Sequence, residues 1–371
     1  MRLDAFTKRV MRKNKSNQSR LPLTISAQYG LVDQITFFNK VVASTDLSNY
    51  YLLKKGEFAY NKSYSSDYPW GAIKRLDNYD QGALSSLYIC FAPQDNVVSD
   101  FILQYFESPK WHKGISEIAV EGARNHGLLN VAVQDFFHTY HYVPKDKKEQ
   151  IKISKLLMLL DERISTQSKI IEDLKKLKSA IIEKLYSEIQ GKEYSYRQLF
   201  EIINERNNRL EFSNVLSASQ ERGMVSREDL NLDIKFERSN INTYKIVRNG
   251  DYVIHLRSFQ GGFAFSNIVG VCSPAYTIMR PKDLLEYGYL SYYFTSRQFI
   301  KSLVIVTYGI RDGRSINVDE WLDMKIVIPT KERQRHIVRT IKVFENRIEN
   351  EEMYASCLLK QKQHLLRQMF I

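Results

Sequence analysis

Two long segments of the chain place apolar residues three, four or seven positions apart among lysine, glutamate and aspartate. The first begins KKEQIKISKLLMLLDERI at 147–164, and the second begins KERQRHIVRTIKVFENRI at 331–348. This spacing predicts two amphipathic helices. Pro144 and Pro329 stand just before them and Gly191 follows the first, as expected at helix boundaries.

Each predicted helix of roughly 40 residues would be about 60 Å long. A single apolar stripe of that length needs cover, so we expect the two helices to pack on each other as an antiparallel pair. The alternative is that each helix packs back on its own globular half. The predicted stripe residues are Ile153, Leu157, Leu160, Ile164, Ile171, Leu174, Ile181, Leu185, Ile337, Ile341, Phe344, Ile348, Leu358, Leu365 and Met369.

The two helical segments belong to a longer internal repeat. Gln150 aligns with Gln334 at an offset of 184 residues (334 − 150), and the offset holds without a gap to the ends of both segments. Upstream the likeness is weaker but keeps its order. The matching stretches are 23–28 with 214–219, 54–64 with 248–258, 103–111 with 291–299, and 122–131 with 309–318. The repeated unit is therefore a globular domain followed by a long helix.

The globular halves mix short alternating stretches, typical of strands, with amphipathic helical ones. We expect strands within 50–60, 85–93, 243–256 and 274–281, and helices at 97–108 and 287–303. The predicted fold class is α+β: two α/β domains related by pseudo-two-fold symmetry, separated by two long antiparallel helices.

The composition limits the kinds of binding partner and the cellular location that can be expected. The chain of 371 residues has 54 Lys and Arg against 42 Asp and Glu, a formal net charge of +12 that favours polyanionic partners such as nucleic acid. Cys90, Cys272 and Cys357 are odd in number and far apart, which argues against a disulfide framework or a thiolate metal site. No apolar run is long enough to span a bilayer. We expect a cytoplasmic protein with no membrane contact.

Motifs for catalysis are missing from the sequence. There is no G-x-x-x-x-G-K-[ST] phosphate loop, no Ser/His/Asp arrangement and no H-E-x-x-H helix. His138 and His141 fall on an expected strand, where residues three apart face opposite sides, so a shared metal is not expected. The stretch DYPW at 67–70 has one proline where an adenine-methylation motif needs two. The sequence predicts a binding protein without catalytic residues or a metal site.

Basic, amide and aromatic residues recur in corresponding loops of both halves, while their letters differ. Arg can hold guanine, and Asn or Gln can hold adenine, each through two hydrogen bonds. Different loop residues on the same fold would recognise two different DNA half-sites. The candidate DNA-binding residues are Ser26, Gln28, Tyr29, Asn61, Lys62, Ser63, Tyr64, Lys74, Arg75, Arg124, Asn125, His126, Ser219, Gln220, Arg222, His255, Arg257, Ser258, Arg311 and Arg314.

This layout resembles the specificity subunit of type I restriction–modification systems. The likeness rests on the twice-used pattern of a proline, then Glu-Gln or Arg-Gln, then a long helix, and on the stretches LTISAQYGLVDQ and AYNKSYSSDYPWGAIKR. The chain departs from the family pattern where Lys145 and Thr330 replace a second proline and where Arg333 precedes Gln334. The resemblance implies target-recognition domains at 1–144 and 191–329 and long spacer helices at 145–190 and 330–371. It also implies that each domain reads one half of a split DNA site and that the helix pair sets the gap between the halves.

The resemblance also implies the partners. Such a subunit binds double-stranded DNA and two modification subunits, which carry S-adenosylmethionine and methylate adenine N6. Restriction (translocase–endonuclease) subunits, which use ATP and Mg, join the same complex. The chain itself is expected to bind no cofactor. Two other functions stay open: a coiled-coil scaffold with protein-binding globular halves, and a self-contained DNA methyltransferase or nuclease.

Overall fold

The structure is a computed structural model that describes residues 1–40, 42–119, 127–219, 222–230, 238–255, 262–308 and 315–370. The chain divides into two compact units. Unit 1 comprises residues 1–168 and 353–371, and unit 2 comprises residues 169–352. Each unit therefore contains one globular part and a portion of both long helices. The four-segment division expected from the sequence stays a prediction.

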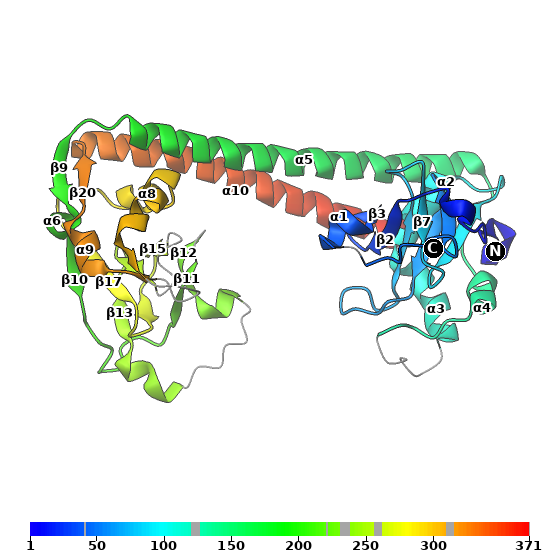
Figure 1. The fold of residues 1–371 in the computed structure, drawn as a ribbon, viewed down its shortest axis with the longest axis horizontal. Helices are drawn as coiled ribbons and strands as arrows, with labels where there is room; N and C mark the ends of the chain where they lie inside the picture. Colours follow the sequence, from blue (N-terminus) through cyan, green and yellow to red (C-terminus); the bar gives the residue numbers. More distant parts are fainter. Residues whose placement is uncertain are drawn as a thin grey trace. The chain divides into compact units, whose positions relative to one another are not determined.

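In its described residues, unit 1 begins with eight strands, four short α-helices and three 3₁₀ helices, followed by the first long helix (Figure 1). Its strands are β1 (Thr7–Arg9), β2 (Pro22–Ser26), β3 (Gly30–Asp33), β4 (Tyr51–Lys54), β5 (Phe58–Asn61), β6 (Ala72–Arg75), β7 (Gln81–Leu84) and β8 (Ile89–Pro93). Its α-helices are α1 (Gln34–Phe38), α2 (Ser99–Glu107), α3 (His112–Ile118), α4 (Val133–His138) and the start of α5 (Lys147–Ser187). The 3₁₀ helices are η1 (Leu3–Ala5), η2 (Lys15–Asn17) and η3 (Pro109–Trp111).

Unit 2 holds the remaining elements in a closely similar order. Its strands are β9 (Lys192–Ser195), β10 (Phe200–Ile203), β11 (Leu216–Ser219), β12 (Gly223–Ser226), β13 (Lys245–Val247), β14 (Tyr252–Ile254), β15 (Phe263–Phe265), β16 (Gly270–Cys272), β17 (Thr277–Pro281), β18 (Thr307–Tyr308), β19 (Ser315–Ile316) and β20 (Lys325–Ile328). Its α-helices are α6 (Tyr196–Leu199), α7 (Tyr289–Tyr293), α8 (Arg297–Ser302), α9 (Val318–Asp323) and most of α10 (Lys331–Gln368). The 3₁₀ helices are η4 (Arg227–Leu230), η5 (Arg238–Thr243) and η7 (Leu303–Val306).

The sheets show that the two units repeat one architecture. In unit 1 the order β1-β8-β5-β6 makes a four-stranded antiparallel sheet, and in unit 2 the order β10-β17-β14-β15 makes its counterpart. The hairpin β2–β3 corresponds to β11–β12, and the pair β4–β7 corresponds to β13–β16. The predicted α+β class, with two sheet-containing domains and two long helices, is confirmed.

A repeated turn enters the same strand of each sheet. Gly56 and Gly250 both have positive φ (86° and 93°), a conformation that costs glycine little. The acid that follows each glycine accepts the backbone N–H three residues before it: Glu57 from Lys54 at 2.8 Å, and Asp251 from Arg248 at 2.9 Å. This explains why the stretches 54–64 and 248–258 resemble each other in sequence.

Each globular part has an aromatic core that the long helices enter at their ends. In unit 1, Leu157 of α5 with Leu366 and Phe370 near the end of the chain join the cluster around Phe58, Tyr60 and Trp111. In unit 2, Ile182 and Tyr186 of α5 join Ile337 and Ile341 of α10 around Trp321. Burying each such side chain stabilises the fold by about 1.5–3 kcal/mol.

The remaining stripe residues do not all follow that pattern. Ile153, Leu365 and Met369 pack at the edge of the unit 1 core, and Leu185 at the edge of the unit 2 core. Other predicted positions are buried or half-buried outside both of these clusters: Leu160, Ile164, Ile171, Leu174, Ile181, Phe344, Ile348 and Leu358. The first part of each long helix packs on the globular part that precedes it, as the alternative interpretation expected, but the last part packs on the other globular core, and the middle packs on neither.

Within each unit the two long helices run antiparallel. In unit 1, Asp161 contacts Lys362, and the guanidinium of Arg163 lies 5.5 Å from the ring centre of Tyr354. In unit 2, Lys175 contacts Glu352 and Lys178 contacts Glu345. In unit 2, later positions of α5 meet earlier positions of α10, which is the signature of antiparallel packing (Figure 1).

A buried glutamine fixes the start of each long helix. The Gln150 side chain accepts the N–H of Val98 and donates to the carbonyl of Pro144, both at 2.7 Å. The Gln334 side chain accepts the N–H of Glu286 at 2.8 Å and donates to the carbonyls of Pro329 and Leu284 at 3.0 Å. The repeated proline and glutamine of the sequence are therefore one hydrogen-bonded device used twice.

Of the two residues that replace the family's second proline, Thr330 has a local explanation. Thr330 caps α10, because its hydroxyl accepts the N–H of Arg333 at 3.4 Å. At the equivalent end of α5, the cap is Asp146, which accepts the N–H of Lys148 at 2.8 Å.

Two local predictions were wrong. His138 ends helix α4 instead of lying on a strand, and His141 is buried in the unit 1 core. The single helix expected at 287–303 is divided into α7 and α8, because the hydroxyl of Ser296 accepts the N–H of Phe299 and starts a new helix there.

The His141 imidazole makes unit 1 sensitive to acid. It lies within hydrogen-bond distance of the hydroxyls of Tyr105 (3.0 Å) and Thr139 (2.7 Å), and burial lowers its pKa from 6.5 to about 4. Between these pH values the unfolded chain takes up a proton that the folded chain does not. Stability should therefore fall by about 3 kcal/mol as the pH drops through this window.

Denaturant unfolding at pH 7 and pH 4.5 measures this effect. His141→Gln should lose part of the pH dependence, whereas replacement of the exposed His364 by glutamine should keep it. An unchanged pH dependence in His141→Gln would contradict the assignment.

Candidate nucleic-acid interface

The tip of the β2–β3 hairpin presents the first candidate residues. Ser26 pairs with Gly30, whose φ is +80°, and the three residues between them form the turn. The Ser26 hydroxyl accepts the N–H of Tyr29 at 3.2 Å and is itself buried. Tyr29 is 67% exposed. Ser26 therefore shapes the turn, while Gln28 and Tyr29 are placed at its tip.

The β11–β12 hairpin of unit 2 builds the same turn with a different side chain at its tip. Ser219 pairs with Gly223, whose φ is +72°, and the Ser219 hydroxyl accepts the N–H of Arg222 at 3.3 Å. Arg222 is exposed and takes the position of Tyr29. Gln220 lies outside the described residues. One frame thus carries a phenol in unit 1 and a guanidinium in unit 2.

The segment Asn61–Tyr64 lies against Gly127, the residue that follows the predicted Arg124, Asn125 and His126 in the sequence. The Asn61 side chain accepts the N–H of Ser63 at 3.0 Å, and the N–H of Tyr64 donates to the carbonyl of Gly127 at 2.7 Å. The ammonium of Lys62 lies 3.4 Å from the carbonyl of Val131. Two loops far apart in sequence therefore meet, and Tyr64 remains 59% exposed beside them.

Lys74 and Arg75 of β6 are engaged in ion pairs. Lys74 contacts Glu107 at 2.6 Å, and its side chain is 12% exposed. Arg75 contacts Asp77 and Asp100, both at 2.7 Å, and its side chain is 11% exposed. These pairs tie β6 to helix α2 and to the turn after β6. Neither cation is free to meet a phosphate in this structure.

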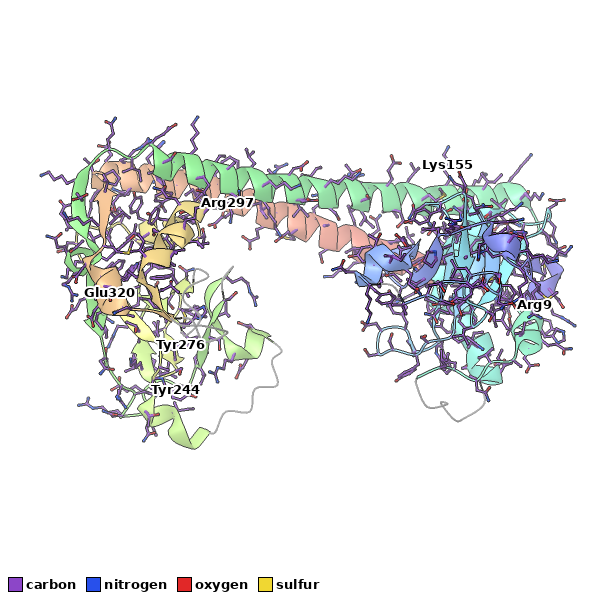
Figure 2. The ribbon with its side chains drawn as sticks, viewed as in Figure 1. Arg9, Lys155, Tyr244, Tyr276, Arg297 and Glu320 are labelled. Carbon is purple, nitrogen blue, oxygen red and sulfur yellow. The ribbon has the colours of Figure 1, made fainter. Side chains whose placement is uncertain are left out.

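The unit 2 candidates are only partly described. His255 follows β14, and its N–H donates to the carbonyl of Gly262 at 3.0 Å. Its ring centre lies 6.2 Å from that of Tyr276, which is labelled in Figure 2. The other predicted residues lie outside the described residues: Arg124, Asn125 and His126 in the first half, and Arg257, Ser258, Arg311 and Arg314 in the second.

An exposed apolar helix escaped the sequence reasoning. Helix α1 contains no buried residue, and Ile35, Phe37 and Phe38 are each 40–44% exposed. The rings of the two phenylalanines contact each other, with centres 5.0 Å apart. The sequence signal was the apolar run ITFF directly after the first hairpin, which suits a core element equally well.

The described segments contain no candidate metal site. Within them, no group of three or more His, Cys, Asp or Glu side chains is placed to hold a metal ion. All three cysteines are free, and burial raises the pKa of the Cys90 and Cys272 thiols to about 12. No described helix combines the length and the apolar character that crossing a membrane requires. The described surface instead presents corresponding hairpin turns in the two units, with Tyr29 exposed in one and Arg222 exposed in the other.

Comparison with known proteins supports the fold. Neither a protein-family model nor a curated protein sequence matches the chain. One similar solved chain comes from a study of complex assembly and conformational transition in a type I R-M system. It has 14% sequence identity and a TM-score of 0.62, and the match covers 99% of this chain and 96% of that chain.

Two further solved structures are similar over the same extent. The HsdS subunit from Thermoanaerobacter tengcongensis has 15% identity and a TM-score of 0.50, with 100% of this chain and 95% of that chain covered. The S subunit of a type I restriction–modification system from M. genitalium has 13% identity and a TM-score of 0.52, with the same coverage. The chain thus has the fold of type I restriction–modification S subunits, as its sequence pattern predicted.

Proposed function

We propose that the chain is the DNA sequence-specificity subunit of a type I restriction–modification complex and has no catalytic activity of its own. The observation that carries the proposal is the fold: the likeness to S subunits extends over 99–100% of the chain. The empty search for catalytic motifs in the sequence agrees with chemistry that is supplied by other subunits.

Each globular domain reads one half of a split, asymmetric DNA site. The matched hairpin tips support this assignment, because Tyr29 and Arg222 occupy one position of the same turn yet offer different chemistry. An arginine can hold guanine through two hydrogen bonds, which a tyrosine cannot do. Two unlike readers on one face of B-DNA would act about one helical turn apart, centre to centre.

Modification subunits dock on the long helices. Leu156 and Leu159 in unit 1, and Ile170 and Leu177 in unit 2, are 41–53% exposed on α5. Leu156, Ile170 and Leu177 are separated by multiples of seven, the spacing at which a partner helix packs. Figure 2 shows Lys155 on the same stretch of α5. The modification subunits would carry S-adenosylmethionine, and the restriction subunits would use ATP and Mg.

Mapping of N6-methyladenine tests the proposal directly. Cells that express the chain with its modification partner are expected to methylate a split motif at every genomic copy. Exchange of residues 1–144 for the corresponding domain of another such subunit should change one half of that motif and leave the other half intact. A motif that changes in both halves, or no methylated motif at all, would contradict the proposed division of labour.

A further inference from the structure

The carboxylate of Asp161 joins three elements of unit 1. One of its oxygens accepts a hydrogen bond from the Lys362 ammonium of α10 at 2.5 Å, and the other accepts from the Gln104 amide of α2 at 2.9 Å. Asp161 itself belongs to α5. A single side chain therefore links both long helices to the globular part of the unit.

The carboxylate of Glu345 does the same in unit 2. One of its oxygens accepts from the Lys178 ammonium of α5 at 3.3 Å, and the other accepts from the Tyr292 hydroxyl of α7 at 2.8 Å. Burial and, after it, the neighbouring Glu345 charge raise the pKa of Tyr292, so its hydroxyl keeps the proton that it donates. Here too one acid joins α5, α10 and the globular part.

The internal repeat relates the two triads residue by residue. Asp161 and Glu345 are equivalent at the offset of 184 residues, and so are Lys178 and Lys362. Gln104 and Tyr292 are each the second residue of the aligned stretches 103–111 and 291–299. The donor from the globular part differs in chemistry, but it meets the same carboxylate position. The arrangement has been kept in both copies while most of the surrounding letters changed.

A nearby ion pair between the two long helices, Lys175–Glu352, is not repeated and serves as a comparison for the triads. Lys175 and Glu352 also join α5 to α10 in unit 2, at 2.7 Å, with side chains 56% and 48% exposed. Their repeat equivalents are Leu359 and Ser168, which cannot form an ion pair. By contrast, the triad lysines are only 15% and 29% exposed. The triads are therefore less hydrated than this pair, and they are repeated.

We infer that the two triads are positioning elements, which fix the axial position of each globular domain on the helix pair and thereby the gap between the two half-sites. This inference rests on the proposed function. A slip of one helical turn moves a contact by about 5.4 Å, which corresponds to roughly one and a half base pairs of B-DNA. A loss of register at the triads is thus large enough to change which gap is read.

The test uses the full chain in complex with its modification subunit. The double variant Asp161→Asn with Glu345→Gln keeps the side-chain sizes and removes both charges from the triads. The substrates are duplexes whose half-sites are separated by the parental gap or by one or two base pairs more or fewer. We expect the variant to methylate neighbouring gaps within tenfold of the parental gap, whereas the parent and the matched control Glu352→Gln stay selective.

Methylation confined to the parental gap in the double variant would overturn the inference. So would a variant that folds and binds the modification subunit but methylates no gap. If the double variant unfolds, Lys362→Met is the second variant, with the same two outcomes. If the parental complex itself methylates no split site, the proposed function fails and the inference falls with it.

The contact on which the inference depends can be tested without DNA. Asp161→Lys and Lys362→Asp should each lower the midpoint of thermal unfolding, and the two changes together should restore most of the loss. Absence of that rescue would refute the tie between the helices of unit 1, whatever the methylation result.

Discussion

Replacing Gln334 by alanine is expected to lower the free energy of unfolding by about 3 kcal/mol. The side chain is 1% exposed and makes three hydrogen bonds to the main chain, one from the N–H of Glu286 and two to the carbonyls of Leu284 and Pro329. Alanine would leave these groups without partners in a buried position and would also open a cavity. Denaturant unfolding measures the loss, and hydrogen exchange at the Glu286 amide reports it locally.

Matched variants separate hydrogen bonding from volume. Gln334→Glu keeps the side-chain size but provides no donor, so most of the loss should remain. Gln150→Ala removes two bonds of the same kind in unit 1, and faster exchange should then appear at the Val98 amide. The exposed Gln361 provides the control substitution. Equal stability of Gln334→Ala and Gln361→Ala would show that the device does not hold the helix.

This device explains why the repeat could be found from sequence. Most repeated positions need only an apolar residue of suitable size, so their letters drift and the likeness becomes weak. At the position of Gln150 and Gln334, one side chain must both donate and accept a hydrogen bond with the main chain at a fixed distance from the helix. A glutamine amide does this in both copies. The alignment therefore had a fixed point from which the offset could be read.

Strand pairing over long distances was beyond the sequence. Local alternation predicted strands around Phe58 and Tyr252, and both are present. Nothing local indicates that Lys325–Ile328 pairs with Lys192–Ser195, as the structure shows. Such partners are set by the packing of distant residues, which a local pattern does not record. The wrong strand at His138 has the same origin, since Phe136 and Phe137 are core residues of a short helix.

Prediction of the DNA-binding residues was limited for a related reason. In the sequence, Lys74, Arg75 and Arg222 are equivalent cations in loops or at strand ends. The structure separates them, because Glu107 and Asp100 pair with the first two while Arg222 stays exposed. Both acids lie more than twenty residues away in the chain. The triad partners Gln104 and Asp161 escaped notice for the same reason, since 57 residues separate them.

Binding of the assembled complex to its DNA site is expected to weaken by roughly 10³-fold or more between 50 mM and 200 mM salt, if about six phosphates or more are neutralised. In the proposed function, two reading domains on one DNA molecule would provide that many contacts, and the chain carries an excess of twelve positive charges. Each neutralised phosphate releases counterions, so the logarithm of the affinity should fall linearly with the logarithm of the salt concentration. Fluorescence anisotropy with a labelled duplex measures the slope. An affinity that stays flat would exclude DNA as the ligand and favour a protein-binding scaffold.

Alanine variants of Arg222 and Lys74 compare the effect of an exposed cation on the salt dependence with that of a cation already in an ion pair. If Arg222 contacts a phosphate, Arg222→Ala should lower the slope by about one unit for every sequence; if it contacts a base, the loss should be about 1–3 kcal/mol and confined to one half-site. Lys74→Ala should leave the slope unchanged, because that ammonium is already paired with Glu107 in the free chain. Its cost should appear instead in the stability of unit 1. A slope that falls equally in both variants would mean that the Lys74–Glu107 pair opens on DNA, and that exposure in the free chain does not identify the cations that bind.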